Sequence, residues 1–300
     1  MYVHALGHSP RFADRVTKML ERVEHRAAVC PADRKAAYQL RYEAYLRENL
    51  LNHRLDAMLH DEVYDASPNA LTTMTYVDGE LASTVRVHVV TDKEGVSPAR
   101  DVFPDVVTPH LRAHRVIIDP SRLAARADMA RRFPELPYFA LRPPWMAAHH
   151  FNADYIVLCS ASGHEGYYRR VYRFHTWSGL RSYPMVTAKV VCMGLDFAAE
   201  MERIESRYPS FRSTSAERDA LFVEFSLSLG RCAATQRTLP ARVDVQPATS
   251  DGTIFGRPPG ASRQPPPEDS RDVSLMAGTL PCLRGRACRR GRSAHPLHGP

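Results

Sequence analysis

The sequence predicts an α/β (α+β) fold in which helices flank one central, mixed and twisted sheet. Two observations predict the sheet: a β-hairpin signal within residues 71–90, and apolar strand-like runs at 154–162 and 185–195. Helical patterns lie before, between and after these strands, so we expect helices on the faces of the sheet. The 300 residues are 44% hydrophobic, which is enough apolar material for a sizeable core.

The first predicted element is a helix over residues 33–50. Ala37, Arg41 and Tyr45 recur there at intervals of four, which places them on one helical face. Asp33 is the candidate N-cap of this helix. The polar stretch that follows contains the acid-rich segment HDEVYD at 60–65, which is typical of a loop.

The hairpin is the clearest local signal in the chain. Two β-branched runs within 71–90 meet at Asp78-Gly79, a dipeptide that favours a two-residue hairpin turn. Strand alternation in the second run places Arg86 and His88 on the face opposite the valines. The sequence therefore predicts one apolar and one polar face for this strand.

The next predicted strand, at 115–119, ends in charged residues. Asp119 closes the strand, and Arg122 follows three residues later. An unpaired charge at the end of a buried strand carries a large desolvation penalty. We therefore expect Asp119 and Arg122 to join an ion-pair network that braces the edge of the sheet.

The later elements follow from capping signals and apolar runs. The Pro143-Pro144 pair predicts the start of a helix. Thr214 and Glu217 form a capping-box pattern before a last helix, which we expect to end near Ser228. Further helices are predicted at 164–174 and 197–207.

Composition divides the chain into a folded domain at 1–230 and a tail at 231–300. The tail holds 10 of the 23 prolines and a single aromatic residue, so it is predicted to be disordered. It also carries 11 arginines, no lysine and 5 acids, which accounts for most of the net charge of +7. Because the folded part is nearly neutral, nucleic-acid binding is not expected.

Several signals point to a cytoplasmic protein. No apolar run is long enough for a transmembrane segment, and the first residues show no secretory signal. The six cysteines have no CxxC spacing and are expected to be reduced thiols. His110 and His114 have a spacing suited to a metal, but no third ligand is indicated, so no metal site is predicted.

Four short motifs then occur in order over residues 38–122: LRYEAY, DEVYD, GELASTVR and DPSR. Together they resemble one branch of the GNAT acyltransferase fold, which contains the autoinducer synthases and the N-acyl amino acid synthases. The resemblance continues through the YYRRVYRF segment to about residue 195. The DPSRLA and YYRR forms are most similar to the N-acyl amino acid synthases, so a GNAT-like fold is expected.

The resemblance also implies the acyl donor. Ordinary GNAT members hold the pyrophosphate of coenzyme A in a glycine-rich loop after the fourth strand. This chain has no glycine from Val96 to Ser162, and Asp119 to Ala124 occupy the position of that loop. The related branch takes its acyl group from the phosphopantetheine of an acyl carrier protein, and no tightly bound cofactor is expected.

The implied function is transfer of a fatty acyl group from acyl carrier protein to the amine of an amino acid. An acyl-homoserine-lactone synthase and a catalytically silent GNAT-like binding module are the alternatives. The autoinducer synthases usually carry a tryptophan soon after the first helix and a glutamate in the fourth motif. Here the first tryptophan is Trp145 and the acid is Asp119, which favours plain N-acylation.

The motif residues supply the candidate binding site. Arg41, Asp65, Arg86, Asp119 and Arg122 are expected to pair with one another, and an architectural role and a direct role both remain open. Arg86 or Arg122 is the candidate for binding the substrate carboxylate through two parallel hydrogen bonds. Tyr45 and Ser121 complete the candidate substrate-binding set.

The reaction also needs a base, because the attacking amine must lose a proton. Glu62 is the first candidate, with Asp65 and Asp119 behind it, and an exposed position for Glu62 is the alternative. Tyr168 could protonate the leaving thiolate or simply pack in the core. The pantetheine arm is expected between diverging strands near 116–119 and 155–160, where backbone N–H groups stabilise the oxyanion.

Overall fold

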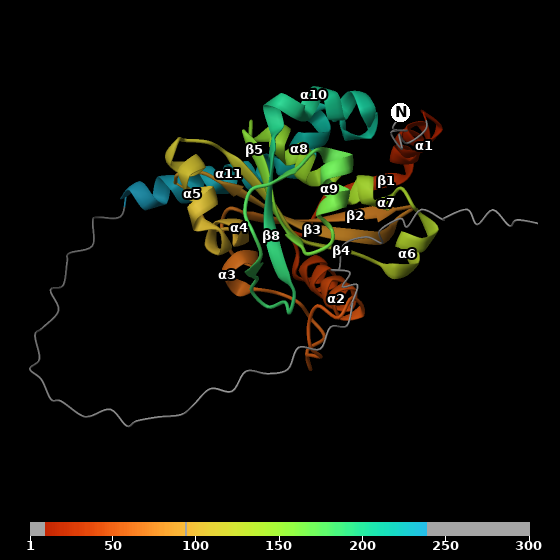
Figure 1. Ribbon diagram of the computed structural model, residues 1–300, viewed down its shortest axis with the longest axis horizontal. Coiled ribbons are helices and arrows are strands. Elements are labelled where there is room, and N and C mark those ends of the chain that lie inside the picture. The colour runs from red at the N-terminus through yellow and green to blue at the C-terminus, as the bar shows by residue number, and fades with distance from the viewer. Residues whose placement is uncertain (1–9, 94, 239–300) are drawn as a thin grey trace, which may run out of the picture.

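The computed structural model describes residues 10–93 and 95–238, and within them eight strands form one mixed sheet flanked by helices (Figure 1). The strand order is β1-β2-β3-β4-β5-β8-β6, and β7 pairs with β8. The strands are β1 (Val23–Ala27), β2 (Ala70–Val77), β3 (Glu80–Val90), β4 (Ile117–Ala125), β5 (Tyr155–Ala161), β6 (His175–Thr176), β7 (Arg181–Ser182) and β8 (Lys189–Asp196). The α/β (α+β) prediction is confirmed.

The described α-helices are α1 (Pro10–Met19), α2 (Pro31–Arg47), α3 (Glu62–Asp65), α4 (Pro98–Val102), α5 (Pro104–Arg112), α6 (Ala127–Arg132), α7 (Leu136–Ala140), α8 (Arg142–His150), α9 (Glu165–Tyr172), α10 (Phe197–Arg207) and α11 (Ser215–Thr238). Of these, α2 and α3 cover the face of the sheet that carries the charged motifs. Two 3-10 turns, η1 (Leu20–Arg22) and η2 (Pro209–Phe211), complete the described elements.

Two predictions about the segments that form α2 and α3 are wrong. Helix α2 begins at Pro31, with Cys30 as the N-cap, and Asp33 is not the cap but donates its backbone N–H to the Cys30 sulfur. Proline is well tolerated in the first turn of a helix, which explains the earlier start. The acid-rich segment predicted as a loop forms the single turn α3, because Asp65 accepts the backbone N–H of Asp61 at 2.8 Å and closes the turn.

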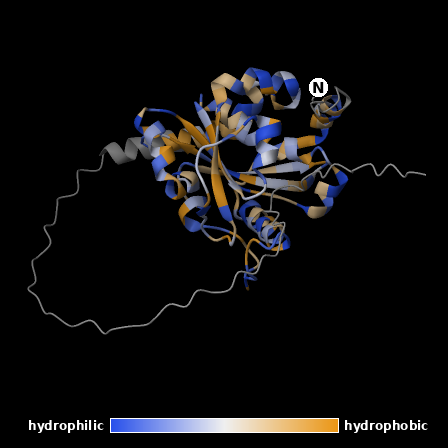
Figure 2. Ribbon diagram, viewed as in Figure 1, coloured by the Kyte–Doolittle hydropathy of each residue, from blue (hydrophilic) through white to orange (hydrophobic). Residues whose placement is uncertain are grey.

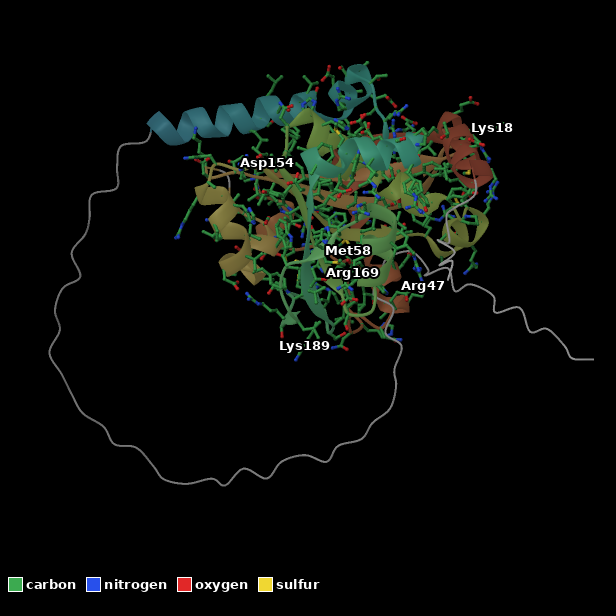
Figure 3. All side chains as sticks on the ribbon, turned by 45° about the horizontal axis from the view of Figure 1, so that its top comes forward. Lys18, Arg47, Met58, Asp154, Arg169 and Lys189 are labelled. Carbon is green, nitrogen blue, oxygen red and sulfur yellow. The ribbon has the colours of Figure 1, made fainter. Side chains whose placement is uncertain are left out.

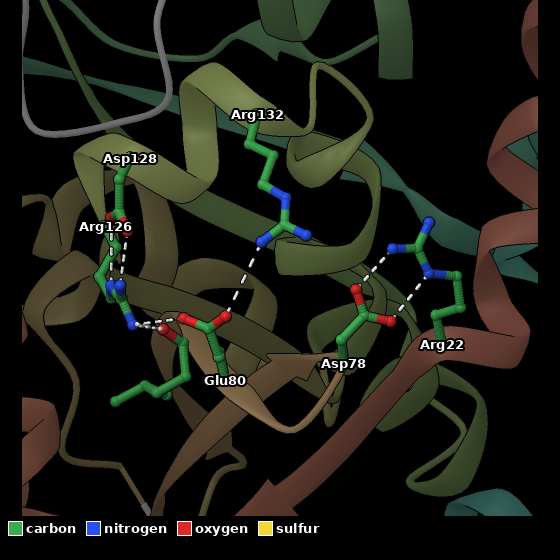
Figure 4. Close-up of polar contacts among 7 residues, drawn as sticks. Arg22, Asp78, Glu80, Arg126, Asp128 and Arg132 are labelled. Atoms are coloured by element: carbon green, nitrogen blue, oxygen red, sulfur yellow. Dashed lines mark hydrogen bonds and ion pairs between the residues drawn. The ribbon is translucent and has the colours of Figure 1, made fainter.

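The predicted hairpin is confirmed, with Asp78 and Gly79 at φ angles of 52° and 79° in its turn. Both residues occupy the left-handed region that a two-residue hairpin turn requires. Figure 4 shows how charges tie the turn to its neighbours: Arg22 contacts Asp78 at 2.8 Å, and Arg126 and Arg132 lie 3.4 and 3.7 Å from Glu80. These pairs are largely exposed and contribute little to stability.

Strands β4 and β5 pair at their first residues only and then diverge. Their parallel register contains just Ile117 with Tyr155 and Ile118 with Ile156. Beyond this point β4 stays with β3, and β5 stays with β8 as far as Ala161. The predicted opening between these strands is therefore present in the sheet.

Strand β4 is longer than predicted and includes the DPSR motif. It begins at Ile117, two residues later than expected, and runs to Ala125. Proline has no N–H to donate to a sheet, and Pro120 lies where β4 has lost its β5 partner. A β-bulge follows, because Arg122 and Leu123 together lie opposite Val85.

The bulge decides which way Arg122 points. Its φ angle of 54° is left-handed, and the extra residue keeps Arg122 on the α2 face together with Asp119 and Ser121. Leu123, next in the chain, packs in the large core on the other face. Simple alternation would have sent Asp119 and Arg122 to opposite faces.

The largest core lies between the sheet and helices α7, α8, α9 and α11. The central strands β5 and β8 are strongly apolar, whereas the helices carry hydrophilic residues outward (Figure 2). On the other face, Trp177 covers Gly194 of β8, and its ring stacks on His110 at a centroid distance of 4.9 Å. A Cβ atom at Gly194 would lie 2.1 Å from the Trp177 ring, so only glycine fits there.

We expect Gly194→Ala to lower the free energy of unfolding by about 2 kcal/mol, because the new methyl group must displace the Trp177 ring. Urea denaturation followed by tryptophan fluorescence measures this change. Gly166→Ala in α9 is the matched control, since no atom lies within 4 Å of the added carbon, and it should be neutral or slightly stabilising. Equal unfolding midpoints for Gly194→Ala and the unchanged protein would contradict the steric argument.

The C-terminal helix confirms the capping box but runs longer than predicted. The Glu217 carboxylate accepts the backbone N–H of Thr214 at 2.7 Å, and the Thr214 hydroxyl accepts the N–H of Glu217 at 3.2 Å. Helix α11 then continues to Thr238, past both Ser228 and the predicted domain boundary at 230. The rest of the predicted tail, 239–300, lies outside the described residues. No helix in the described part of the chain has the length and apolar character to cross a membrane.

Candidate functional site

Arg41, Asp65 and Arg86 form a buried cluster beneath helices α2 and α3. Both arginine side chains are 0% exposed, and Asp65 is 4% exposed. One carboxylate oxygen, Oδ1 of Asp65, lies 2.8 Å from Nη1 of Arg41 and 3.0 Å from Nη1 of Arg86. The Arg86 contact is off the hydrogen-bonding direction and is an ion pair only. The predicted pairing of these three residues is confirmed.

The electrostatics of Asp65 follow from these neighbours. Burial alone would raise the pKa of Asp65, but the Arg41 and Arg86 charges outweigh burial and lower it to about 2. Asp65 is therefore ionised at neutral pH. Arg41 also donates to the Thr72 hydroxyl at 2.8 Å, so the cluster joins α2, α3 and β2.

Ser121 connects the cluster to β4. The Nε atom of Arg86 donates to the Ser121 hydroxyl at 3.1 Å, and the Nη2 atom of Arg86 has no hydrogen-bond partner among the described residues. The ring of Tyr64 lies 5.3 Å from the Arg86 guanidinium carbon. Arg86 is thus held on several sides, which leaves it little freedom to bind a substrate.

Arg122 makes no ion pair within the described residues, and the predicted pairing with Asp119 is wrong. Its guanidinium lies between the rings of Tyr45 and Tyr183, at 5.8 and 5.5 Å from their centroids. The Nη2 atom donates to the backbone oxygen of Pro184 at 3.2 Å, and the buried Nη1 atom has no hydrogen-bond partner in the described chain. Although the bulge places both side chains on the α2 face, Asp119 accepts a hydrogen bond from Ala99 of α4, whereas Arg122 is held between Tyr45 and Tyr183.

Asp119 lies at the point where β4 leaves β5. It is 1% exposed, and its Oδ2 atom accepts the backbone N–H of Ala99 at 2.8 Å. Burial raises the pKa of Asp119 to about 7, although the Ala99 hydrogen bond opposes this shift. The Oδ1 atom has no hydrogen-bond partner among the described residues. A carboxyl group of this kind exchanges a proton readily near neutral pH.

His88 is a neighbour of this site that the sequence analysis placed on the right face without assigning it a role. It lies opposite Asp119 in the β3–β4 register, and its Nε2 atom is 3.2 Å from the backbone oxygen of Tyr64. Burial lowers the pKa of His88 to about 3, so the ring is neutral. Tyr183 was also missed, because its segment lies about sixty residues from Arg122 in sequence and carries no motif.

The charges of the site do not balance. Three buried arginines (Arg41, Arg86 and Arg122) face one fully ionised carboxylate, Asp65, and one carboxyl group that titrates near neutrality, Asp119. Buried charge without a partner is costly, so the site favours an anionic ligand. A carboxylate or a developing oxyanion would supply the missing charge.

The remaining predicted residues occupy different places. Glu62 is exposed on α3, and no contact joins it to the arginines among the described residues, so its role as base stays a prediction. Tyr45 contacts Arg122 through its ring. Tyr168 is 6% exposed and belongs to the core on the opposite face of the sheet. The structure thus brings together Arg41, Tyr45, Asp65, Arg86, Asp119, Ser121 and Arg122.

A small apolar cavity of about 20 Å³ lies behind the opening between β4 and β5, on the face that α8 and α9 cover. Pro120, Ile156 and Leu158 form its wall on the sheet, and Tyr168 and Trp145 belong to the helical side. All ten lining residues are apolar or aromatic. The sheet opening therefore has a charged pocket on one face and an apolar cavity on the other.

The β4–β5 gap opens toward one end of the β5–β8 ladder. Asp154 and Lys189, labelled in Figure 3, mark the two ends of the β5–β8 ladder, and the gap opens toward the Lys189 end. Arg47 reaches the last carbonyl of β4, that of Ala125, at 3.5 Å. Arg169 lies on α9, the helix that follows β5.

Within residues 10–93 and 95–238, no three histidine, cysteine, aspartate or glutamate side chains are grouped to hold a metal ion. His110 stacks against Trp177, and His114 pairs with Asp92 at 2.7 Å. Aromatic packing accounts for His110, and a surface hydrogen bond with Asp92 accounts for His114.

Several solved structures are similar to this chain. The structure of FeeM, an N-acyl amino acid synthase from uncultured soil microbes, has a TM-score of 0.50 and 17% identity, and the match covers 59% of this chain and 92% of that one. A CoA-dependent acyl-homoserine lactone synthase, MesI, has a TM-score of 0.43 and 14% identity, and the match covers 64% of this chain and 97% of that one. An acyl-CoA N-acyltransferase from Pseudomonas aeruginosa has a TM-score of 0.37 and 16% identity, and the match covers 57% of this chain and 97% of that one.

The sequence itself matches the family described as N-acyl amino acid synthase FeeM over residues 36–196, which is more than half of the chain. No curated protein matches it. The matched region contains most of α2, the diverging strands and the whole charged cluster. The chain therefore belongs to the N-acyl amino acid synthase FeeM family and is an N-acyltransferase with a GNAT-like fold.

Proposed function

We propose that this enzyme transfers a fatty acyl group from the phosphopantetheine thioester of an acyl carrier protein to the α-amine of an amino acid. One observation carries the proposal: a buried, positively charged cluster lies on one face of the β4–β5 opening, and an apolar cavity lies on the other. A substrate carboxylate suits the cluster, the apolar lining of the cavity suits the hydrocarbon of an acyl group, and the thioester joins them at the opening.

The features of β4 beside the opening support an acyl carrier protein as the acyl donor. No glycine-rich segment lies where coenzyme A pyrophosphate would need backbone N–H groups, because β4 continues through that stretch with Pro120 and the buried Arg122. The free β4 edge beyond Ile118 offers backbone groups to a pantetheine arm, much as a sheet accepts an added strand.

The position of Arg122 supports an amino acid as the acyl acceptor. Arg122 is the buried arginine of the site that makes no ion pair among the described residues, and its Nη1 atom has no hydrogen-bond partner there. Its rigid position between Tyr45 and Tyr183 presents a fixed guanidinium edge, which suits a carboxylate. This placement favours Arg122 over Arg86 as the group that binds the substrate carboxylate.

In the proposed reaction, the amine nitrogen forms a bond to the thioester carbon and the carbon–sulfur bond breaks. Asp119 accepts the proton that the amine loses, since its pKa of about 7 and its position at the opening support the role of base more directly than the exposed Glu62. The departing thiolate takes up a proton, and Tyr168 beside the cavity is the candidate donor.

The direct test incubates the purified protein with acyl carrier protein loaded with fatty acyl groups and with a mixture of amino acids, followed by mass spectrometry. We expect N-acyl amino acids, and a much lower rate with the matching acyl-CoA. Acyl-homoserine lactones from S-adenosylmethionine would instead identify the enzyme as an autoinducer synthase. Equal rates with acyl-CoA would contradict the proposed donor.

We expect Arg122→Lys to raise the KM for the amino acid by on the order of 100-fold, because lysine cannot form the paired hydrogen bonds of a guanidinium. The KM for the acyl carrier protein should change little. Arg126→Lys is the matched control, since Arg126 forms an ion pair with Asp128 near the surface. An unchanged amino-acid KM in Arg122→Lys would remove Arg122 from the carboxylate site.

A further inference from the structure

One wall of the apolar cavity comes from a segment that follows the family match. Phe211 belongs to η2, which begins at Pro209, whereas the match ends at residue 196. Phe211 is 0% exposed and lines the cavity together with Trp145 and Tyr172. The sheet side of the same cavity is formed by Pro120, Ile156 and Leu158, next to the β4–β5 opening. Phe211 thus faces the cavity from a segment outside the sheet.

Phe211 sits in a dense aromatic group. Its ring centroid lies 5.3 Å from that of Trp145 and 5.5 Å from that of Tyr172. Tyr138 and Tyr208 follow at 6.4 and 6.5 Å. Rings at such distances pack edge to face or tilted, and few rotamer changes are available to them in a close-packed core. A chain entering from the sheet meets this group as a firm barrier.

Arg142 fixes the segment that carries Phe211. Its side chain is buried, and its Nε and Nη2 atoms donate to the backbone oxygens of Ser210 and Arg212, each at 2.8 Å. Nη2 also contacts the Glu217 carboxylate at 2.8 Å, and Glu217 belongs to the capping box of α11. The two residues that flank Phe211 are therefore bonded to α8, and the ring cannot withdraw without breaking these contacts.

We infer that Phe211 sets the upper limit of the acyl chain length that this enzyme accepts. The inference rests on the proposed function, because it places the end of the fatty acyl chain in the cavity. Each methylene group buried in an apolar site improves binding about fourfold, and this gain stops where the chain meets a side chain that cannot move. The limit then depends on η2, which lies outside the matched region, and not on the charged motifs.

Replacing Phe211 should therefore change product length. Phe211→Ala removes the six-carbon ring, and because cores collapse only partly around such a gap, we expect the preferred acyl chain to lengthen by about two to four carbons. Phe211→Leu should lengthen it by about two carbons with less loss of stability. Phe211→Trp should shorten it.

Phe222→Ala is the matched control. Phe222 is also 0% exposed and packs in the same core, against His150 and Phe151, but it does not line the cavity. Both alanine variants should lower the melting temperature by on the order of 10 °C. Only the Phe211 variants should change the distribution of acyl lengths.

The experiment gives each full-length variant an equimolar mixture of acyl carrier proteins that bear saturated chains of different lengths and reads the products by mass spectrometry. A longer distribution for Phe211→Ala and Phe211→Leu, with Phe222→Ala unchanged, supports the inference. An active Phe211→Leu enzyme with the original distribution overturns it and leaves the proposed function intact. A wild-type enzyme that forms no acyl amino acid overturns both.

Discussion

Asp119→Asn is expected to lower kcat by roughly 100- to 10,000-fold, the range over which a positioned base contributes to proton transfer. Asparagine keeps the shape of the side chain and can still accept the N–H of Ala99, so the fold should be preserved. The variant loses only the ability to take a proton from the attacking amine. Steady-state kinetics with saturating acyl carrier protein and amino acid measures the effect.

The pH dependence separates this chemical role from a structural one. Burial raises the pKa of Asp119 to about 7, so the fraction of active, ionised enzyme should rise with pH around a midpoint near 7. In Asp119→Asn this step should disappear, which leaves only the ionisation of the substrate amine. A residual rate with the same midpoint near 7 would show that another group acts as the base.

The stability of the folded protein should change with pH in the direction opposite to its activity. The pKa of Asp119 is higher in the folded protein than its ordinary value of 3.8, so its contribution is fully present below pH 3.8 and declines as the pH rises to about 7. Asp119→Asn removes a buried ionisation and should not lower the melting temperature at pH 8. A large drop at that pH would mean that the Asp119 carboxylate itself supports the fold.

Asp65→Asn is expected to have the largest effect on stability, a loss of about 3–5 kcal/mol. It leaves Arg41 and Arg86 buried without the carboxylate that they share, and breaking a buried ion pair from one side is far more costly than its net contribution. Urea denaturation at pH 7 measures the loss. Asp105→Asn, at an exposed ion pair with Arg181, is the control and should change the midpoint little.

The same variant should remove part of the acid sensitivity of the protein. Arg41 and Arg86 lower the pKa of Asp65 to about 2 against the opposing effect of burial, so its stabilisation is present above pH 3.8 and is lost as the pH falls toward 2. Asp65→Asn should therefore unfold with a shallower dependence on pH between 4 and 2. An unchanged slope there would mean that other carboxylates dominate acid unfolding.

The elements that the sequence predicted well are those that local chemistry specifies. The Asp78-Gly79 turn, the Pro143-Pro144 helix start and the Thr214–Glu217 capping box each act over a few residues, and all three are confirmed. The β1 strand was missed because Val23–Ala27 is short and alternates polar with half-buried residues. Helices α4 and α5 were missed because prolines made their segment resemble a connection.

The sequence predicted which residues form the site better than it predicted how their side chains are arranged. The motifs brought Arg41, Asp65 and Arg86 together correctly, because two arginines and one carboxylate in a core have few other partners. The pairing of Asp119 with Arg122 was wrong, since Asp119 is held by Ala99 of α4 and Arg122 by the rings of Tyr45 and Tyr183, which come from segments distant in sequence.

The sequence by itself determined the hairpin, the charged motifs and the family resemblance, because turn chemistry, capping and motif order are read over short distances along the chain. Only the tertiary structure decided at which residue pair β4 and β5 part, that burial moves the pKa of Asp119 to about 7, and that Phe211 of η2 closes the apolar cavity. Each of these depends on which distant segments meet and exclude water, and such long-range contacts are not encoded in any local pattern.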